Sequence, residues 1–168
     1  MDITEFAGLA SATVPDWSRE EIHGFWDPGR KLLRAIRKYQ IARQRGTIFG
    51  SISSKYWVLS HWFWSIVTQS EIHLNCTIGG GLLLPHPTGI IIHPSSRIGP
   101  NCLIFHQVTF VGAVEVEGHC DIGAGAKIIG PVKIGKHVQI GANAVVLQDI
   151  PEKSIAVGVP ARIVELSA

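Results

Sequence analysis

The spacing of hydrophobic residues along the chain changes near Ser70. From residue 28 to about residue 45, apolar residues recur every three to four positions, and Arg and Lys occupy the opposite face. This spacing predicts an amphipathic basic helix. Asp27 directly before Pro28 offers an N-cap followed by proline at the first helical position. We therefore expect residues 1–70 to form an α-helical N-terminal region.

Two further helices are expected in this region. Ser18 followed three positions later by Glu21 resembles a capping box. Gly46 and Gly50 interrupt the basic helix, and the serines at 51–54 offer an N-cap for a third helix. That helix is rich in tryptophan: Trp57, Trp62 and Trp64. Its aromatic side chains require a surface to pack against.

After Ser70 the period becomes six. Fourteen positions in this register are aliphatic or aromatic, with one two-residue slip: Ile72, Ile78, Leu84, Ile90, Ile92, Ile98, Ile104, Phe110, Val116, Ile122, Ile128, Ile134, Ile140 and Val146. A second small or apolar residue follows four places later in nearly every repeat. Such a repeat predicts a solenoid, here a parallel β-helix of about five coils with three hexapeptides per coil. Cys76, Cys102 and Cys120 occupy the second position, so we expect them in the core.

Composition and charge narrow the function. The chain has 168 residues, 46% hydrophobic and 17% charged, with a net charge of +2, which fits a globular domain and not a nucleic-acid binder. The apolar stretch at 56–67 is too short and polar to cross a bilayer. The acidic residues 1–5 do not resemble a signal peptide. Three cysteines without a CxxC pair suggest neither disulfides nor a metal site, and we expect a cytoplasmic protein.

Several motifs carry a resemblance to a known family. They are EIH at 71–73, IGGGLLLPHPTGI at 78–90, IGAGAKIIG at 122–130, IGANAVV at 140–146 and AVGVPARIV at 156–164. With them, residues 71 to about 164 resemble the bacterial serine acetyltransferases, which use acetyl-CoA to make O-acetylserine for cysteine biosynthesis. The resemblance implies a mainly β fold, a left-handed parallel β-helix over residues 71–168 with a C-terminal tail. The helical region also resembles shorter members found among polysaccharide genes.

The resemblance implies a catalytic pair. His86 matches the general base of the family, and Glu71, fifteen positions upstream, matches the acidic residue that orients it. A neutral imidazole suits proton removal from a hydroxyl at pH 7. Taken alone, His86 would read as a turn residue between two prolines. Other histidines have weaker claims: His73, His93 and His106 could line the same cleft, His119 and His137 resemble surface turn residues, and His61 a helix-packing residue.

The resemblance also places acetyl-CoA. By position, Gly112, Ala124 and Ala142 match small residues that line the pantetheine groove in the family. The basic residues Lys127, Lys136 and Arg162 could meet the nucleotide phosphates or could be solvated surface charges. No metal is expected.

Two departures concern the acceptor. Pro85 stands where serine acetyltransferases have an acidic residue for the substrate's amino group, and residues 110–115 run straight into the next repeat without the family's glycine-rich substrate loop. A sugar hydroxyl is therefore an alternative acceptor to serine. A γ-class carbonic anhydrase shares the β-helix, but the histidine spacing here does not match its zinc site. A purely structural coil is a further alternative.

We expect a homotrimer or a dimer of trimers. The basic helix could order the trimer, pair trimers, or contact an anionic membrane surface. The sequence ends with residues 165–168, ELSA, and lacks the C-terminal isoleucine with which the family docks into cysteine synthase. That partnership is not expected here.

Overall fold

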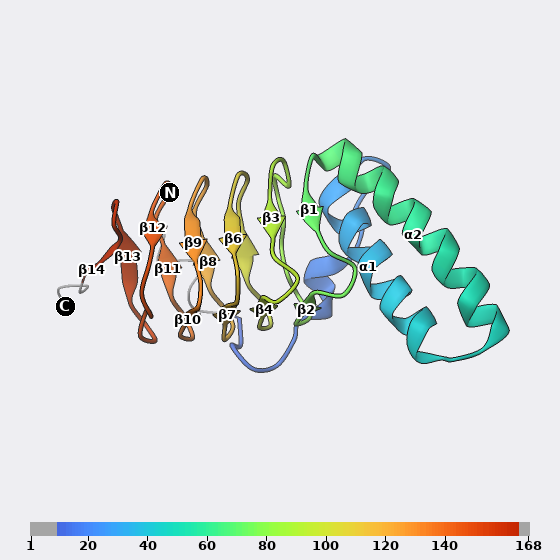
Figure 1. The fold of residues 1–168 in the computed structure, drawn as a ribbon, viewed down its shortest axis with the longest axis horizontal. Helices are drawn as coiled ribbons and strands as arrows, with labels where there is room; N and C mark the ends of the chain where they lie inside the picture. Colours follow the sequence, from blue (N-terminus) through green and yellow to red (C-terminus); the bar gives the residue numbers. More distant parts are fainter. Residues whose placement is uncertain (1–9, 165–168) are drawn as a thin grey trace.

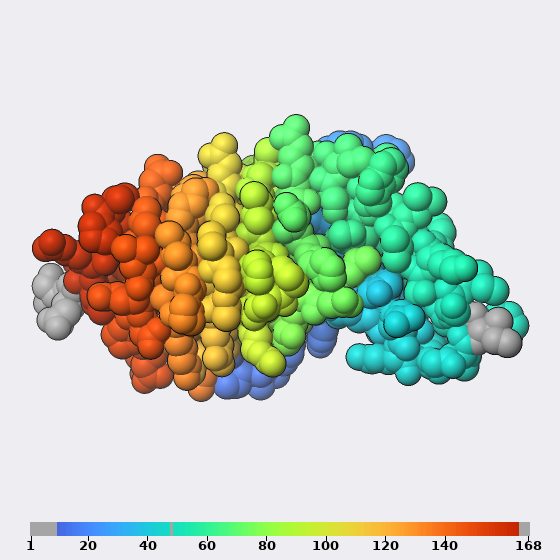
Figure 2. Space-filling model, in the orientation of Figure 1, coloured from blue at the N-terminus to red at the C-terminus, as the bar shows by residue number. Residues whose placement is uncertain are grey.

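Two helices cover one end of a stack of β-coils (Figure 1). The structure is a computed structural model that describes residues 10–164, except for the side chain of Ile48. The C-terminal residues 165–168, on which the cysteine synthase prediction rests, lie outside the described residues, as do residues 1–9. The coils appear as successive bands along the molecule, with the helices projecting beyond the first of them (Figure 2).

The helices follow the predicted pattern with two corrections. Helix α1 (Pro28–Gln44) begins at Asp27, whose side chain accepts from the Arg30 backbone N–H, as predicted. The predicted capping box at Ser18 is wrong, because Asp16 caps a single 3₁₀ turn, η2 (Trp17–Glu20). Helix α1 is amphipathic as expected: Leu32, Leu33, Ala35 and Ile36 are buried, whereas Arg34 and Lys38 are exposed.

The predicted start of the aromatic helix is also wrong. Helix α2 (Ile48–Thr68) is capped by Thr47, so it begins before the serines at 51–54. Gly50 lies in its first turn and does not break it. A Cβ atom on Gly50 would lie 2.6 Å from the Ala42 carbonyl oxygen of α1. The glycine therefore permits close helix packing, a contact that local sequence does not show.

The remaining chain forms the parallel β-helix that was predicted, with three sheets along its sides. The first sheet contains β1 (Glu71–Ile72), β3 (Ile91–Ile92), β6 (Thr109–Val111), β9 (Lys127–Ile129) and β12 (Val145–Val146). The second contains β2 (Thr77–Ile78), β4 (Arg97–Ile98), β7 (Val114–Val116) and β10 (Val132–Ile134). The third contains β5 (Leu103–Ile104), β8 (Asp121–Ile122), β11 (Gln139–Ile140), β13 (Ile155–Val157) and β14 (Arg162–Val164).

The strand register confirms the repeat. Thr109 pairs with Lys127, one 18-residue coil later, and all fourteen predicted repeat positions are buried. The three cysteines are buried and free. The last strand departs from the pattern, because β14 pairs antiparallel with β13 and turns the chain back at the end of the stack.

A partly buried ion pair joins the helices to the first coil. Arg37 of α1 donates to Glu20 of η2, with Nη2 2.8 Å from Oε1. The same guanidinium donates to the carbonyl oxygens of Ile78 and Gly79 beside β2. The Glu20 carboxylate also accepts from the Gly81 backbone N–H at 2.9 Å. One charge pair thus connects η2, α1 and the solenoid.

The N-terminal segment before η2 runs along the solenoid and is held by Asn101. The Asn101 side chain is buried and donates to the carbonyl oxygens of Ser11 and Val14, at 2.6 and 2.8 Å. Its Oδ1 accepts from the Asp16 backbone N–H. Among the helices described, none is both long enough and apolar enough to cross a membrane.

Candidate active site

The two-residue slip in the repeat produces one enlarged turn, and His86 is in it. Glu71 pairs with Ile91, 20 residues later, and Leu83 pairs with Leu103 at the same spacing. Ile91 then pairs with Thr109 at the regular spacing of 18. The two additional residues therefore lie between Leu83 and Ile91, where the sequence departs from the hexapeptide pattern.

Hydrogen bonds from both sides fix the turn that carries His86. The Ser70 hydroxyl, at the end of α2, donates to the Pro87 carbonyl oxygen. From the next coil, the Gln107 backbone N–H donates to the Thr88 carbonyl oxygen at 2.9 Å. The His86 side chain is exposed on the outside of this turn. The backbone is thus held in place while the imidazole remains accessible.

His86 lines a cleft between this turn and the beginning of α1. The cleft has a volume of about 590 Å³, and its lining includes Asp27, Gly29 and Arg30 of the helix. A Cβ atom on Gly29 would overlap the Leu84 carbonyl oxygen, so the helix backbone lies directly against the turn. Asp27 and Arg30 form an ion pair at 3.2 Å. A carboxylate, a guanidinium and an imidazole therefore share one cleft.

His106 lies beside His86 in the next coil. The two ring centroids are 6.2 Å apart, and the rings are inclined at 77°. The Nδ1 atom of His106 is shielded from solvent and has no hydrogen-bond partner among residues 10–164. His106 was expected to line the same cleft as His86. It lies beside His86 but is not among the residues that line this cleft.

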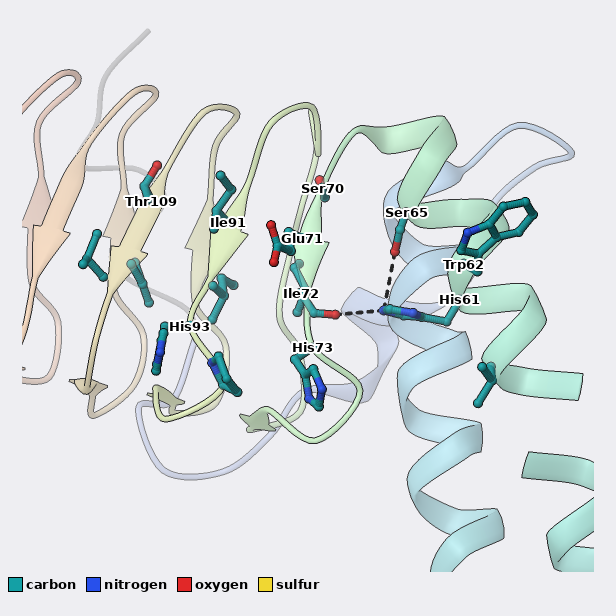
Figure 3. Close-up of a pocket in the computed structure, with 15 residues that line it drawn as sticks. His61, Trp62, Ser65, Ser70, Glu71, Ile72, His73, Ile91, His93 and Thr109 are labelled. Carbon is teal, nitrogen blue, oxygen red and sulfur yellow. Dashed lines mark hydrogen bonds between the residues drawn. The ribbon is translucent and has the colours of Figure 1, made fainter. Parts of the chain in front are cut away.

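Glu71 lines a different cleft, of about 640 Å³, between α2 and the first sheet (Figure 3). His73 and His93 face this second cleft and not that of His86. The Glu71 backbone N–H donates to the Ile90 carbonyl oxygen at 2.8 Å, at the end of the His86 turn. Within residues 10–164, no hydrogen bond or ion pair joins the Glu71 and His86 side chains. The catalytic pair stays a prediction.

The other histidines have structural roles. His61 of α2 donates from Nε2 to the Ile72 carbonyl oxygen at 2.8 Å, and burial lowers the pKa of its imidazole. His61 thus packs α2 against β1, as expected (Figure 3). His119 was expected at the surface but is buried. Its Nδ1 is hydrogen-bonded to His137 Nδ1 at 2.8 Å, across neighbouring coils.

The predicted cofactor residues lie at opposite ends of the strands of the first sheet. Gly112 follows β6 and has φ +73°, a left-handed conformation that favours glycine. Ala124 and Ala142 precede β9 and β12, and their turns are stacked, since the Asn143 N–H donates to the Ala124 carbonyl oxygen at 2.8 Å. The sheet separates Gly112 from the two alanines. One chain therefore does not gather them into a single groove.

The basic residues predicted to contact the CoA phosphates differ in their exposure and in the hydrogen bonds they already make. Lys127 Nζ donates to the Gln107 carbonyl oxygen at 2.6 Å and to the Thr109 hydroxyl at 3.0 Å, so the coil surface holds it. Arg162 is exposed on β14, and Lys136 is partly buried. Arg162 therefore has the greatest freedom to meet an anionic ligand.

Sequence reasoning missed Asp27 and Arg30 as cleft residues. The sequence marked Asp27 only as a helix cap, because it lies about 60 positions from His86 and only tertiary packing brings them together. The predicted loss of the substrate loop is confirmed, since the two residues Gly112 and Ala113 suffice to connect β6 to β7. In the described part of the chain, no cluster of three His, Cys, Asp or Glu residues is arranged to hold a metal ion.

A hexapeptide coil with an enlarged histidine-bearing turn defines the chain as a hexapeptide-repeat β-helix protein. No protein-family model matches the chain. It is 35% identical to the serine acetyltransferase of Mycobacterium tuberculosis, over 63% of the chain and 56% of that protein. It is 36% identical to the serine acetyltransferase of Escherichia coli K12, over 84% of the chain and 46% of that protein.

Solved structures agree with these relatives. A serine acetyltransferase in complex with CoA aligns with a TM-score of 0.70 and 33% identity, over 83% of the chain and 57% of that structure. The Neisseria gonorrhoeae enzyme in complex with serine aligns with a TM-score of 0.71 and 28% identity, over 83% and 58%. The chain belongs to the serine acetyltransferase family, whose left-handed β-helix it shares. It spans about half the length of the curated relatives it matches.

Proposed function

We propose that the chain is an acetyl-CoA-dependent O-acetyltransferase that acetylates the hydroxyl of L-serine, with His86 as general base. The observation that carries the proposal is the position of His86, exposed in a fixed turn and facing a cleft beside α1. Relatives named serine acetyltransferase, one solved with CoA and one with serine, support the same chemistry. Acetyl-CoA is a cosubstrate in this reaction.

The reaction requires one proton acceptor. Neutral His86 takes the hydroxyl proton as the serine oxygen forms a bond to the thioester carbonyl carbon. The tetrahedral intermediate then breaks its C–S bond, and the imidazolium returns the proton to the CoA thiolate. Glu71 would act as a positioning residue by accepting from the other ring nitrogen of His86. Its place beside the end of the turn, through the bond to Ile90, is compatible with this role.

Asp27 and Arg30 support an amino-acid acceptor. The Asp27 carboxylate and the Arg30 guanidinium, which pair with each other in the cleft of His86, carry the charges complementary to the ammonium and carboxylate of serine and would exchange partners with it. They would offset the loss of the acidic residue at Pro85 and of the substrate loop. These same two losses favour a sugar hydroxyl as the second candidate acceptor.

The separation of the cofactor residues supports assembly. Gly112 follows a strand of the first sheet, whereas Ala124 and Ala142 precede strands of it, so they lie at opposite strand ends. A groove between copies of the chain would use both strand ends, so we propose a homotrimer, or a dimer of trimers, with cosubstrate sites between copies. Buried free cysteines fit a cytoplasmic location.

Release of free thiol from acetyl-CoA, measured with serine, homoserine and a panel of sugars, tests the acceptor. We expect serine to support turnover. Asp27→Asn, which preserves the helix cap, and Arg30→Gln should raise KM for serine, whereas Lys153→Gln on the far coils should not. Turnover with a sugar but not with serine would overturn the serine assignment in favour of the second candidate.

A further inference from the structure

The outward side of α2 is an apolar surface. Six large side chains follow one another at alternating spacings of three and four residues, with exposed fractions between 50% and 85%: Phe49, Ile52, Tyr56, Leu59, Phe63 and Ile66. We call these six residues the α2 stripe. The opposite side of the helix is occupied, because Gly50 approaches Ala42 of α1 and His61 is bonded to the Ile72 carbonyl oxygen. A surface of this size is rarely left exposed without a partner.

The helical segment that carries the α2 stripe has only positive charges. Residues 28–70 contain no Asp or Glu and eight basic residues: Arg30, Lys31, Arg34, Arg37, Lys38, Arg43, Arg45 and Lys55. The remainder of the chain holds the other seven basic residues and all thirteen acidic ones, a net charge of −6. Residues 28–70 thus carry a formal charge of +8 on a protein whose overall charge is only +2, and of their cations Arg30 and Arg37 are paired with Asp27 and Glu20.

The exposed cations and the apolar side chains meet at the tip of the helical pair. Arg43 and Arg45 are exposed at the end of α1, and Phe49 and Ile52 are exposed in the first turns of α2. Lys55 follows on the same helix. This tip projects beyond the coils (Figure 2). A helix that presents aromatic and aliphatic side chains beside basic ones is suited to the boundary between lipid headgroups and acyl chains.

We propose that the α2 stripe and its neighbouring basic residues bind the surface of an anionic phospholipid bilayer. The apolar side chains would enter the headgroup boundary, and Arg43, Arg45 and Lys55 would meet lipid phosphates. Because the inner side of α2 is packed against α1 and β1, the helix lies on the bilayer and keeps the solenoid in water. The cytoplasmic leaflet carries the negative surface potential that this binding requires.

A second copy of the chain is the competing occupant. The three-and-four spacing of the α2 stripe would also fit a helix–helix seam. Pairing two such surfaces, however, would bring two groups of exposed cations together, Arg43, Arg45 and Lys55 from each copy, and residues 28–70 contain no acidic residue to pair with them. Like charges across an interface oppose association. Charge complementarity therefore favours the lipid surface over the second copy.

Co-sedimentation with vesicles tests the proposal without reference to the reaction. The wild-type protein should bind vesicles of equal parts phosphatidylglycerol and phosphatidylcholine, and bind pure phosphatidylcholine at least tenfold more weakly. The Arg43→Gln/Arg45→Gln variant should lose about tenfold or more in partitioning, and added salt should weaken wild-type binding. The matched charge control is Arg97→Gln/Lys153→Gln, on exposed coil residues, which should bind like wild type.

The apolar part is tested by Ile52→Ser/Leu59→Ser, which should reduce partitioning at least tenfold. Its control is Val14→Ser/Leu147→Ser, which alters similarly exposed apolar residues away from the helices. The proposal is overturned if wild type binds neither kind of vesicle, or if all four variants bind alike. It is also overturned if Ile52→Ser/Leu59→Ser only lowers the oligomer mass, since a second copy would then cover the α2 stripe. If Ile52→Ser/Leu59→Ser does not fold, the comparison of Arg43→Gln/Arg45→Gln with Arg97→Gln/Lys153→Gln decides whether the protein binds the vesicles through its helical tip.

Discussion

Replacing Arg37 by methionine should destabilise the protein more than any other single change at the junction of helices and solenoid. Its side chain is only 15% exposed, and that of Glu20 is 10% exposed, so solvent screens their attraction weakly. Methionine keeps the apolar stem but leaves the Glu20 carboxylate buried without a cation, and two carbonyl oxygens lose their donor. Removing one partner of a fully buried pair costs about 3–5 kcal/mol, and we expect a loss toward the lower end of this range for this partly buried pair.

Urea unfolding followed by tryptophan fluorescence, at one fixed protein concentration, measures this loss. The double variant with Glu20→Gln provides the matched control, because glutamine still accepts from the Gly81 and Leu82 N–H groups without a charge. The double variant should lose at least about 2 kcal/mol less than the sum of the single losses. A loss of unfolding free energy below about 1 kcal/mol for Arg37→Met, or strictly additive losses in the double variant, would refute the claim that this ion pair joins the helices to the solenoid.

Three further predictions concern the coils and α2. Phe110→Ala should lower the free energy of unfolding by about 3–5 kcal/mol, since the ring is 1% exposed in the column of the solenoid; a loss under 1 kcal/mol would mean the site is not tightly packed. Gly112→Ala should lose about 1–2 kcal/mol through its φ of +73° alone, because the nearest atom to a new Cβ is 3.8 Å away; an unchanged melting temperature would contradict this. Burial lowers the pKa of His61 below 6.5, so its folded form binds fewer protons than the unfolded chain. The protein should therefore lose stability as the pH falls from about 6.5 toward the lowered pKa of His61. In melting curves recorded across this pH range, His61→Gln should show less of this acid-dependent loss.

The coil could be read from the sequence because its signal is local. Each repeat residue, such as Ile122 or Ile128, repeats the same burial six positions later, so the register, the core and the site of the slip follow from spacing alone. The cap at Asp27 is equally local, since it bonds three residues ahead. These features need no knowledge of distant contacts.

Features formed by docking could not be read in this way. Gly50 suggests a helix break until Ala42 is known to pack against it. The cleft of His86 depends on α1 lying against the turn, which no spacing encodes, so Asp27 and Arg30 were missed as its lining. His119 resembles a surface turn residue, yet it is buried beside a histidine one coil away. In each case the partner is distant in sequence.

The role of His86 is the central claim, and the turnover number for acetyl-CoA-dependent thiol release tests it most directly. With the best acceptor, His86→Ala should lower kcat by about 10²–10⁴, the contribution of a general base. His106→Gln, a change in the neighbouring ring 6.2 Å away, is the matched control and should retain most of the activity. Full activity in His86→Ala would contradict the account, as would an equal loss in both variants.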